Sequence, residues 1–204
     1  AVRHLKTNAA TYNIDPERIV LVGSSAGGNL VTLLATRNGP NSTARVAAVV
    51  NLYGPTILYA PESAGDVRIP QMLGCSGHTI VGTECYLRAI EASPITHVDA
   101  HNPPIITFHG SSDGGFPAAP LFQAAGMAAG AEFTLVVVPC ATECHNKATM
   151  FAGTTYGRSN VDVMYEWIDY HVGCTVSPGI SVGTHNGTAS PPPPPMRRRL
   201  SGVS

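Results

Sequence analysis

Residues 18–35 read RIVLVGSSAGGNLVTLLA, and this stretch decides the fold. The apolar run 18–22 predicts a buried strand. The run that begins at Ala26 predicts a helix to about Arg37, before the helix-breaking triplet Asn-Gly-Pro at 38–40. Only a very tight turn fits between the two elements.

This turn has the pattern Gly-x-Ser-x-Gly, with Ser25 at its apex. Gly23 and Gly27 stand two residues before and after the serine, where a side chain would obstruct so sharp a bend. The turn would expose the serine hydroxyl above the sheet edge, and the amide N–H of Ala26 would face a developing oxyanion. We therefore predict a nucleophile and one oxyanion donor; a Gly-rich turn without chemistry is the alternative.

Strand and helix patterns alternate along the rest of the chain. Strands are expected at 46–53, 105–109 and 133–138, and helices at 1–12, 117–130 and 161–172. The run 46–53 is apolar without a polar alternation, which is typical of a strand in a parallel sheet covered on both faces. The alternation predicts an α/β fold with a mostly parallel sheet and helices on both faces.

The pattern also predicts how the chain is divided. Residues 1–174 are expected to form the folded domain. Within it, 56–104 form an insertion over the sheet edge, with a helix at 84–91. Residues 175–204 contain a run of five prolines followed by MRRRL, so they cannot bury apolar surface and are expected to be disordered.

Composition limits the classes of partner. The 204 residues are 44% hydrophobic and 12% charged, with a formal net charge of -1. No strong field draws such a chain to nucleic acid or to an anionic membrane, and no apolar run is long enough to span a bilayer. A small-molecule substrate is expected, while the oligomeric state is left open.

The cysteines leave two interpretations open. Cys75 with Cys85, and Cys140 with Cys144, are spaced to close short loops in an oxidising compartment, while Cys174 is left over. Free thiols in the cytosol are equally compatible. The sequons at Asn41 and Asn186 favour the secretory route slightly, and the compartment stays open. Cys140, Cys144 and His145 lack a second ligand pair, so neither a metal nor a cofactor is expected.

Two further residues could form a proton relay with Ser25, that is, a chain of side chains that takes up and returns the serine proton. The carboxyl ends of parallel strands meet at one edge of the sheet. Asp113 follows the strand that ends at His109, and His145 follows the strand that ends at Val138. The order serine, acid, histidine is the one that this architecture requires. An imidazole can take the serine proton and return it near neutral pH, and a carboxylate behind the ring fixes its tautomer.

Each assignment has an alternative. Asp113 is otherwise an ordinary turn aspartate, and Asp99 and Asp66 lie in less well placed loops. His145 is otherwise a surface histidine. His109, at a strand end, is expected to be structural. The remaining histidines that we weighed lie in the insertion or on the last helix: His97, His101 and His171.

Three segments together resemble the α/β-hydrolase superfamily. They are the run 1–35, ASPITHV at 92–98, and NPPIITFHGSSDGGFP at 102–117. Within the superfamily the chain is similar, over about residues 1–172, to carboxylesterases of the BD-FAE type, and also to the hormone-sensitive-lipase-like esterases. The resemblance implies an α/β-hydrolase fold and hydrolysis of carboxylic esters through an acyl-enzyme. It implies Ser25 as nucleophile, Asp113 as acid and His145 as base.

The chain also departs from that family. Its esterases carry an HGG-like loop before the elbow, which supplies further oxyanion donors, and Ala1 already stands within a predicted helix. We therefore expect the first strands and that loop to be missing. Losing one such donor costs about 100- to 1,000-fold in rate. The alternative function is accordingly a truncated or catalytically impaired hydrolase-like domain that serves in binding or assembly. The family usually has Gly where this chain has Cys144.

Overall fold

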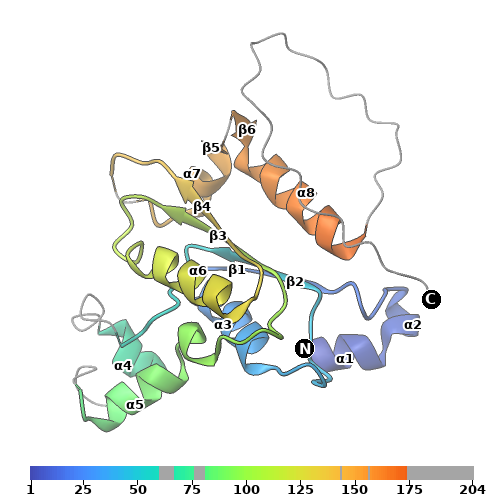
Figure 1. Cartoon of the computed structure of the whole chain (residues 1–204), viewed down its shortest axis with the longest axis horizontal. Helices are drawn as coiled ribbons and strands as arrows, with labels where there is room; N and C mark the ends of the chain where they lie inside the picture. Colours follow the sequence, from blue (N-terminus) through green and yellow to red (C-terminus); the bar gives the residue numbers. More distant parts are fainter. Residues whose placement is uncertain (60–66, 76–80, 143, 156, 174–204) are drawn as a thin grey trace. The chain divides into compact units, whose positions relative to one another are not determined.

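The computed structural model describes residues 1–59, 67–75, 81–142, 144–155 and 157–173, all within one compact unit. A parallel sheet in the order β1-β2-β3-β4 runs through this part (Figure 1). The strands are β1 Val20–Ser24, β2 Ala48–Leu52, β3 Ile105–Gly110 and β4 Phe133–Val138. In the central register, Val50 pairs with Val22 on one side and with Ile106 on the other.

Helices cover both faces of this sheet, as predicted (Figure 1). Those that pack against the strands are α3 Ala26–Arg37, α6 Ala118–Ala129, α7 Lys147–Ala152 and α8 Asn160–Val172, while α1 Val2–Thr7 and α2 Ala9–Tyr12 precede β1. Successive strand residues point to opposite faces. Val49 therefore packs with Phe122 of α6, while Val50 belongs to the cluster that contains Trp167 of α8. β2 is buried along its whole length.

The predicted helix over 1–12 is interrupted. Asn8 has φ -106° and ψ 23°, outside the helical region, and separates α1 from α2. Its side-chain amide donates to the carbonyl of His4 at 2.8 Å. Asparagine favours such local bonds over a helix interior, which accounts for the break. Asn13, with φ 51°, ends α2 where the sequence predicted the helix to stop.

Between β2 and β3 the described residues form short helices. These are α4 Arg68–Leu73, α5 Glu84–Glu91 and the 3-10 helix η2 Pro94–His97. The predicted helix at 84–91 is therefore confirmed; the Thr83 hydroxyl accepts from the Tyr86 amide at its start. A disulfide between Cys75 and Cys85 joins the end of α4 to α5.

Two elements near the C-terminal end of the described part were not predicted. They are α7 and a two-stranded antiparallel hairpin, β5 Thr154–Thr155 with β6 Arg158–Ser159. Each is too short to show a clear period in the sequence. The predicted disorder over 175–204, the left-over Cys174 and the sequon at Asn186 lie outside the described residues.

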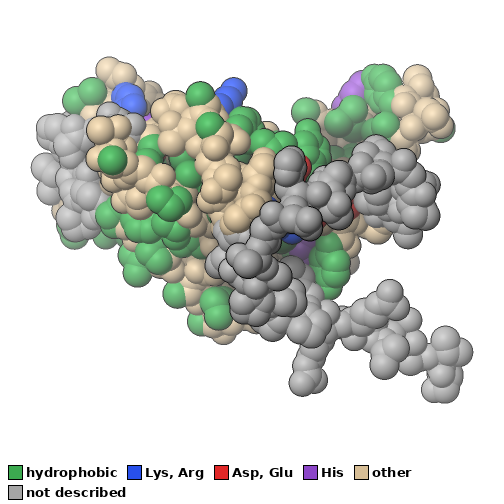
Figure 2. All heavy atoms as spheres, turned by 90° about the horizontal axis from the view of Figure 1, so that it is seen from above, with side chains coloured by type: hydrophobic (Ala, Val, Ile, Leu, Met, Phe, Trp, Pro, Cys, Tyr) green, Lys and Arg blue, Asp and Glu red, His purple; other side chains and the backbone are tan. Residues whose placement is uncertain are grey.

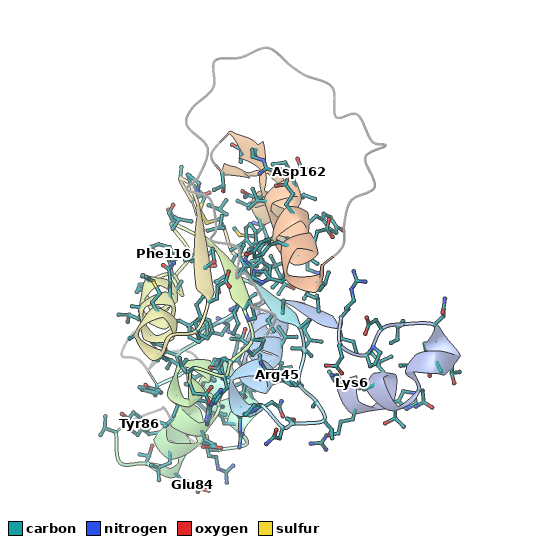
Figure 3. The ribbon with its side chains drawn as sticks, turned by 45° about the vertical axis from the view of Figure 1, so that its right-hand side comes forward. Lys6, Arg45, Glu84, Tyr86, Phe116 and Asp162 are labelled. Atoms are coloured by element: carbon teal, nitrogen blue, oxygen red, sulfur yellow. A yellow bond between two sulfur atoms is a disulfide. The ribbon has the colours of Figure 1, made fainter. Side chains whose placement is uncertain are left out.

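Charged side chains are dispersed over the described surface. Lys6 on α1, Glu84 on α5 and Asp162 on α8 lie well apart (Figure 3). On the face in Figure 2, most described side chains are apolar or uncharged. Among the helices that the structure describes, none is both long and apolar enough to span a membrane.

Candidate active site

Ser25 stands on a strained turn between β1 and α3, as the sequence predicted. Its φ is 54° and its ψ is -126°, a conformation that non-glycine residues rarely adopt. The turn is held from both sides: the Ser25 amide donates to the Leu52 carbonyl at 2.9 Å, and the Ser25 carbonyl accepts from the Asn29 amide at 3.1 Å. Strain of this kind is found at functional sites, where the surrounding structure maintains it.

Of the two glycines of the motif, the surrounding structure requires only Gly23. A Cβ on Gly23 would lie 2.2 Å from the carbonyl oxygen of Gly27, so this position requires glycine. A Cβ on Gly27 itself would meet no described atom within 4 Å apart from its chain neighbours and the backbone of its own helix. The second required glycine is Gly28, where a Cβ would lie 2.3 Å from Oδ1 of Asn51. Sequence reasoning missed Gly28 because its neighbour comes from β2, far along the chain.

This difference gives a matched pair of variants. Gly23→Ala must push the turn open, and we expect it to lower the free energy of unfolding by about 1–3 kcal/mol, as overpacking does. Gly27→Ala should leave that free energy unchanged or raise it by up to about 1 kcal/mol, because alanine favours a helix. Urea unfolding of both variants measures the contrast. Equal stability of the two would contradict the assignment of the clash.

The structure brings Ser25, His145 and Asp113 together in one hydrogen-bonded chain. Oγ of Ser25 lies 2.7 Å from Nε2 of His145, and Nδ1 of His145 lies 2.7 Å from Oδ2 of Asp113. An ionised carboxylate can only accept, so Nδ1 carries the proton, and Nε2 of the neutral ring accepts from the serine hydroxyl. The three residues follow β1, β4 and β3, at the carboxyl edge of the sheet.

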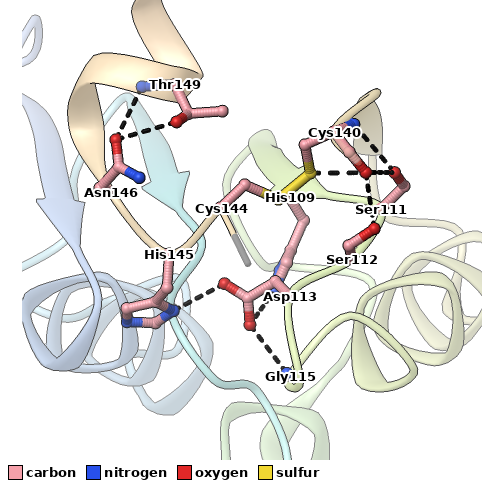
Figure 4. Close-up of a disulfide and its surroundings, with 10 residues drawn as sticks. All are labelled: His109, Ser111, Ser112, Asp113, Gly115, Cys140, Cys144, His145, Asn146 and Thr149. Atoms are coloured by element: carbon pink, nitrogen blue, oxygen red, sulfur yellow. Dashed lines mark hydrogen bonds and ion pairs between the residues drawn. A yellow bond between two sulfur atoms is a disulfide. The ribbon is translucent and has the colours of Figure 1, made fainter. Parts of the chain in front are cut away.

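Asp113 is held as a buried carboxylate. Its side chain is only 5% exposed. Oδ1 accepts from the Gly115 amide at 2.8 Å, while Oδ2 faces His145 (Figure 4). Burial alone would raise the pKa of this carboxyl group, but its contacts with His109, the Gly115 amide and His145 outweigh burial and lower the pKa to about 2. Asp113 therefore stays charged throughout the neutral range.

A disulfide stands directly before the histidine. Cys144, the residue before His145, is bonded to Cys140 at the end of β4 (Figure 4). The bridge packs against Gly110 of β3, where a Cβ would lie 2.0 Å from Sγ of Cys144. Among the described cysteines, the pairing that the sequence left open is therefore 75 with 85 and 140 with 144. The Cys144 side chain, in place of the family's glycine, forms part of this support.

The loops that carry Asp113 and His145 are also tied to each other. The hydroxyl of Ser112 donates to the Cys140 carbonyl at 2.6 Å, and the Cys140 amide donates to the Ser111 hydroxyl at 3.2 Å. On the other side of His145, Asn146 caps α7 by accepting from the Thr149 amide at 2.8 Å. The imidazole thus lies between two fixed points of the backbone (Figure 4).

Tyr53 is a site residue that sequence reasoning missed. It follows β2, has φ 45°, and is buried. Its ring meets the His145 ring nearly edge to face, with 4.6 Å between centroids. A positive φ is unusual for so bulky a residue, and the turn aims this side chain at the imidazole. The sequence feature that could have identified Tyr53 as a site residue is its position at the end of a strand, directly before Gly54.

A cavity of about 610 Å³ opens onto the serine and the imidazole. Its apolar lining comes from the end of β2, the following segment, α4 and α6: Tyr53, Pro55, Ile57, Leu58, Val67, Ile69, Met72 and Ala118. Its polar lining includes Asn29 and Arg68. Ala26, the first residue of α3, also lines it beside Ser25.

The alternative residues lie elsewhere. The carboxylate of Asp99 accepts from the His101 amide at 2.7 Å within its own turn, and Asp66 is outside the described residues. His97 bonds the Glu91 carbonyl, and His171 lies against Glu132. Within the described part of the chain, no cluster of three or more histidine, cysteine or acidic side chains is placed to hold a metal ion.

A parallel sheet covered by helices on both faces, with a serine on a strained strand-to-helix turn, defines an α/β-hydrolase. The chain belongs to the BD-FAE family, whose sequence profile matches residues 1–123. The matched region contains Ser25 and Asp113 and ends before His145.

The chain is also similar to individual proteins. The chain is 33% identical over 124 residues to the probable carboxylic ester hydrolase LipM of Mycobacterium tuberculosis, a match that covers 55% of this chain and 28% of LipM. Among solved structures, the propionate-bound esterase Est2 of Thermogutta terrifontis superposes with a TM-score of 0.60 at 24% identity, covering 87% of this chain and 64% of Est2. A truncated carbohydrate esterase from gut microbiota gives 0.59 at 22% identity, covering 84% of this chain and 66% of that one. The two structures show the fold.

Proposed function

We propose that this site hydrolyses carboxylic esters through an acyl-enzyme formed on Ser25. The observation that carries the proposal is the continuous chain of short hydrogen bonds from Ser25 through His145 to Asp113, with the serine end facing the cavity. A serine hydroxyl is a weak nucleophile until a base takes its proton, and this arrangement supplies that base in contact with the oxygen.

In the acylation step, Oγ of Ser25 attacks the ester carbonyl carbon while Nε2 of His145 takes the hydroxyl proton. The resulting imidazolium is stabilised at Nδ1 by the carboxylate of Asp113. As the tetrahedral intermediate collapses, the bond to the alcohol oxygen breaks and Nε2 returns the proton to that oxygen. The acid part of the ester then remains on the serine.

Deacylation repeats these steps with water. His145 removes a proton from the water, the hydroxide oxygen attacks the acyl carbon, and the proton returns to Oγ of Ser25 as the carboxylic acid leaves. In both halves, the carbonyl oxygen becomes an oxyanion beside the turn. The amide of Ala26 is the donor that we assign to it, because it is the first amide of α3 and adjoins the nucleophile.

The lining of the cavity suggests the substrate class. Apolar side chains line much of its wall beside polar groups, and its volume of about 610 Å³ suits a small ligand. We therefore propose esters with a short or aromatic acyl group. The similarity to LipM, a probable carboxylic ester hydrolase, supports the reaction class. Because the chain spans 28% of the length of that relative, activity is to be measured on the intact protein.

Covalent labelling tests the proposal. A fluorophosphonate probe should react with the intact protein, and peptide mapping should place the modification on Ser25, because only a serine activated by a base attacks the probe. The same preparation should hydrolyse p-nitrophenyl acetate. Labelling of another serine would force a new assignment of the nucleophile. The absence of both labelling and hydrolysis would favour the alternative, a hydrolase-like domain that serves in binding.

A further inference from the structure

His109 lies against the relay without a hydrogen bond of its own. It belongs to β3, is only 1% exposed, and neither of its ring nitrogens has a hydrogen-bond partner among the described residues. A buried polar group that forms no full hydrogen bond destabilises the folded state. The other large side chains of this strand are apolar, so a hydrocarbon would fill the position at lower cost. The imidazole of His109 is therefore expected to make the folded protein less stable than an apolar side chain of the same size would.

The ring is directed at the acid of the relay. Nε2 of His109 lies 3.5 Å from Oδ1 of Asp113, four residues further along the chain (Figure 4). Both side chains are buried, at 2% and 5% exposure. Gly115 lies beside both groups: a Cβ built on it would be in van der Waals contact with them, 3.4 Å from Oδ1 and 3.5 Å from Nε2. The Phe116 ring meets the His109 ring nearly edge to face, with 6.0 Å between centroids.

The two oxygens of Asp113 are thus divided between two sets of partners. Among the described residues, Oδ2 bonds Nδ1 of His145, while Oδ1 faces both the Gly115 amide and the second imidazole. A proton on Nε2 of His109 points positive charge at Oδ1 whether the ring is neutral or protonated. This attraction opposes rotation of the carboxylate and keeps Oδ2 in line with His145.

We propose that His109 is a positioning residue for the ester hydrolysis described above: it acts through Asp113 to fix the orientation of the carboxylate that supports His145. The inference rests on the proposed function. It assigns a role in the reaction to a residue whose place at a strand end otherwise indicates only a structural part.

Two substitutions separate the electrostatic contact from space filling. His109→Met fills the same space with an apolar side chain of similar length but removes the N–H donor. It should lower kcat by about 10- to 100-fold, with KM changed by less than about twofold. His109→Gln returns an N–H near the position of Nε2 and should recover most of kcat. A Gln variant as slow as the Met variant would overturn the proposal, and so would a Met variant with unchanged kcat.

A double-mutant cycle then tests the route of action. In the Asp113→Asn background, with the Ser25→Ala rate subtracted, His109→Met should cause no further loss, because the carboxylate that it positions is gone. The same fold-loss in both backgrounds would show a merely structural effect and overturn the inference. Thr107→Val, a buried substitution two residues earlier on the same strand, serves as the packing control.

The two proposals fail in different ways. If the intact wild-type protein neither hydrolyses p-nitrophenyl acetate nor takes the fluorophosphonate label, the proposed function is wrong, and the inference about His109 falls with it. If wild type is active and depends on Ser25 while the His109 variants match wild type, the inference alone is wrong.

Discussion

Replacing Ser25 by alanine in the intact protein is expected to lower kcat for p-nitrophenyl acetate by about 10⁴- to 10⁶-fold. The methyl group cannot form the acyl-enzyme, so only water attack assisted by the remaining donors of the site is left. The rate of p-nitrophenol formation at saturating substrate is compared between the variant and the wild type. Binding should change little, because the cavity walls are untouched.

The chain offers a close control for this variant. Ser24 immediately precedes the turn apex, at the end of β1, and takes no part in the relay. Ser24→Ala should therefore keep kcat within about threefold of wild type, as expected for a change that leaves the transition-state contacts intact. If the two variants hydrolyse the ester at equal rates, Ser25 is not the nucleophile.

Asp113→Asn is expected to have the second largest effect, a fall in kcat of about 10⁴-fold. The amide NH₂ can be turned toward His145, which favours the tautomer with its proton on Nε2. That tautomer cannot accept the proton of Ser25. An amide also carries no charge to stabilise the imidazolium. The variant keeps the size of the side chain, so the fold should persist.

Steady-state kinetics and circular dichroism together check this prediction. The matched control is Asp99→Asn, which alters a turn carboxylate outside the relay and should leave kcat near the wild-type value. A native spectrum with near-wild-type kcat in Asp113→Asn would show that the carboxylate is dispensable. A lost spectrum would instead mean that Asp113 is needed for folding.

Much of the architecture could be predicted because the longer strands and helices show a clear local pattern in the sequence. The apolar run 133–138 coincides with β4, and the helix that starts at Ala26 ends at Arg37 as expected. The convergence of Asp113 and His145 also follows from topology, since parallel strands place the loops that follow them at one edge. The rule that these loops lie at one edge of the sheet was sufficient to find both residues.

The parts that sequence could not supply depend on contacts between distant segments. Gly28 is constrained by Asn51 of β2, and no local pattern reveals this. Tyr53 meets His145 across 92 positions of the sequence, as their numbers show. The spacing of Cys140 and Cys144 was compatible with both a bridge and free thiols. In each case the deciding information is a distance in space.

The strand order has a consequence for the fidelity of folding. Ser25 follows one edge strand of the described sheet and His145 follows the opposite edge strand, so three strand pairings in series set the 2.7 Å between their side-chain atoms. A slip of one residue in any pairing displaces the following loop by about 3.3 Å. The nucleophile and its base would then be out of reach of each other. Measured hydrolysis of an ester would therefore indicate that all three strand pairs have the native register.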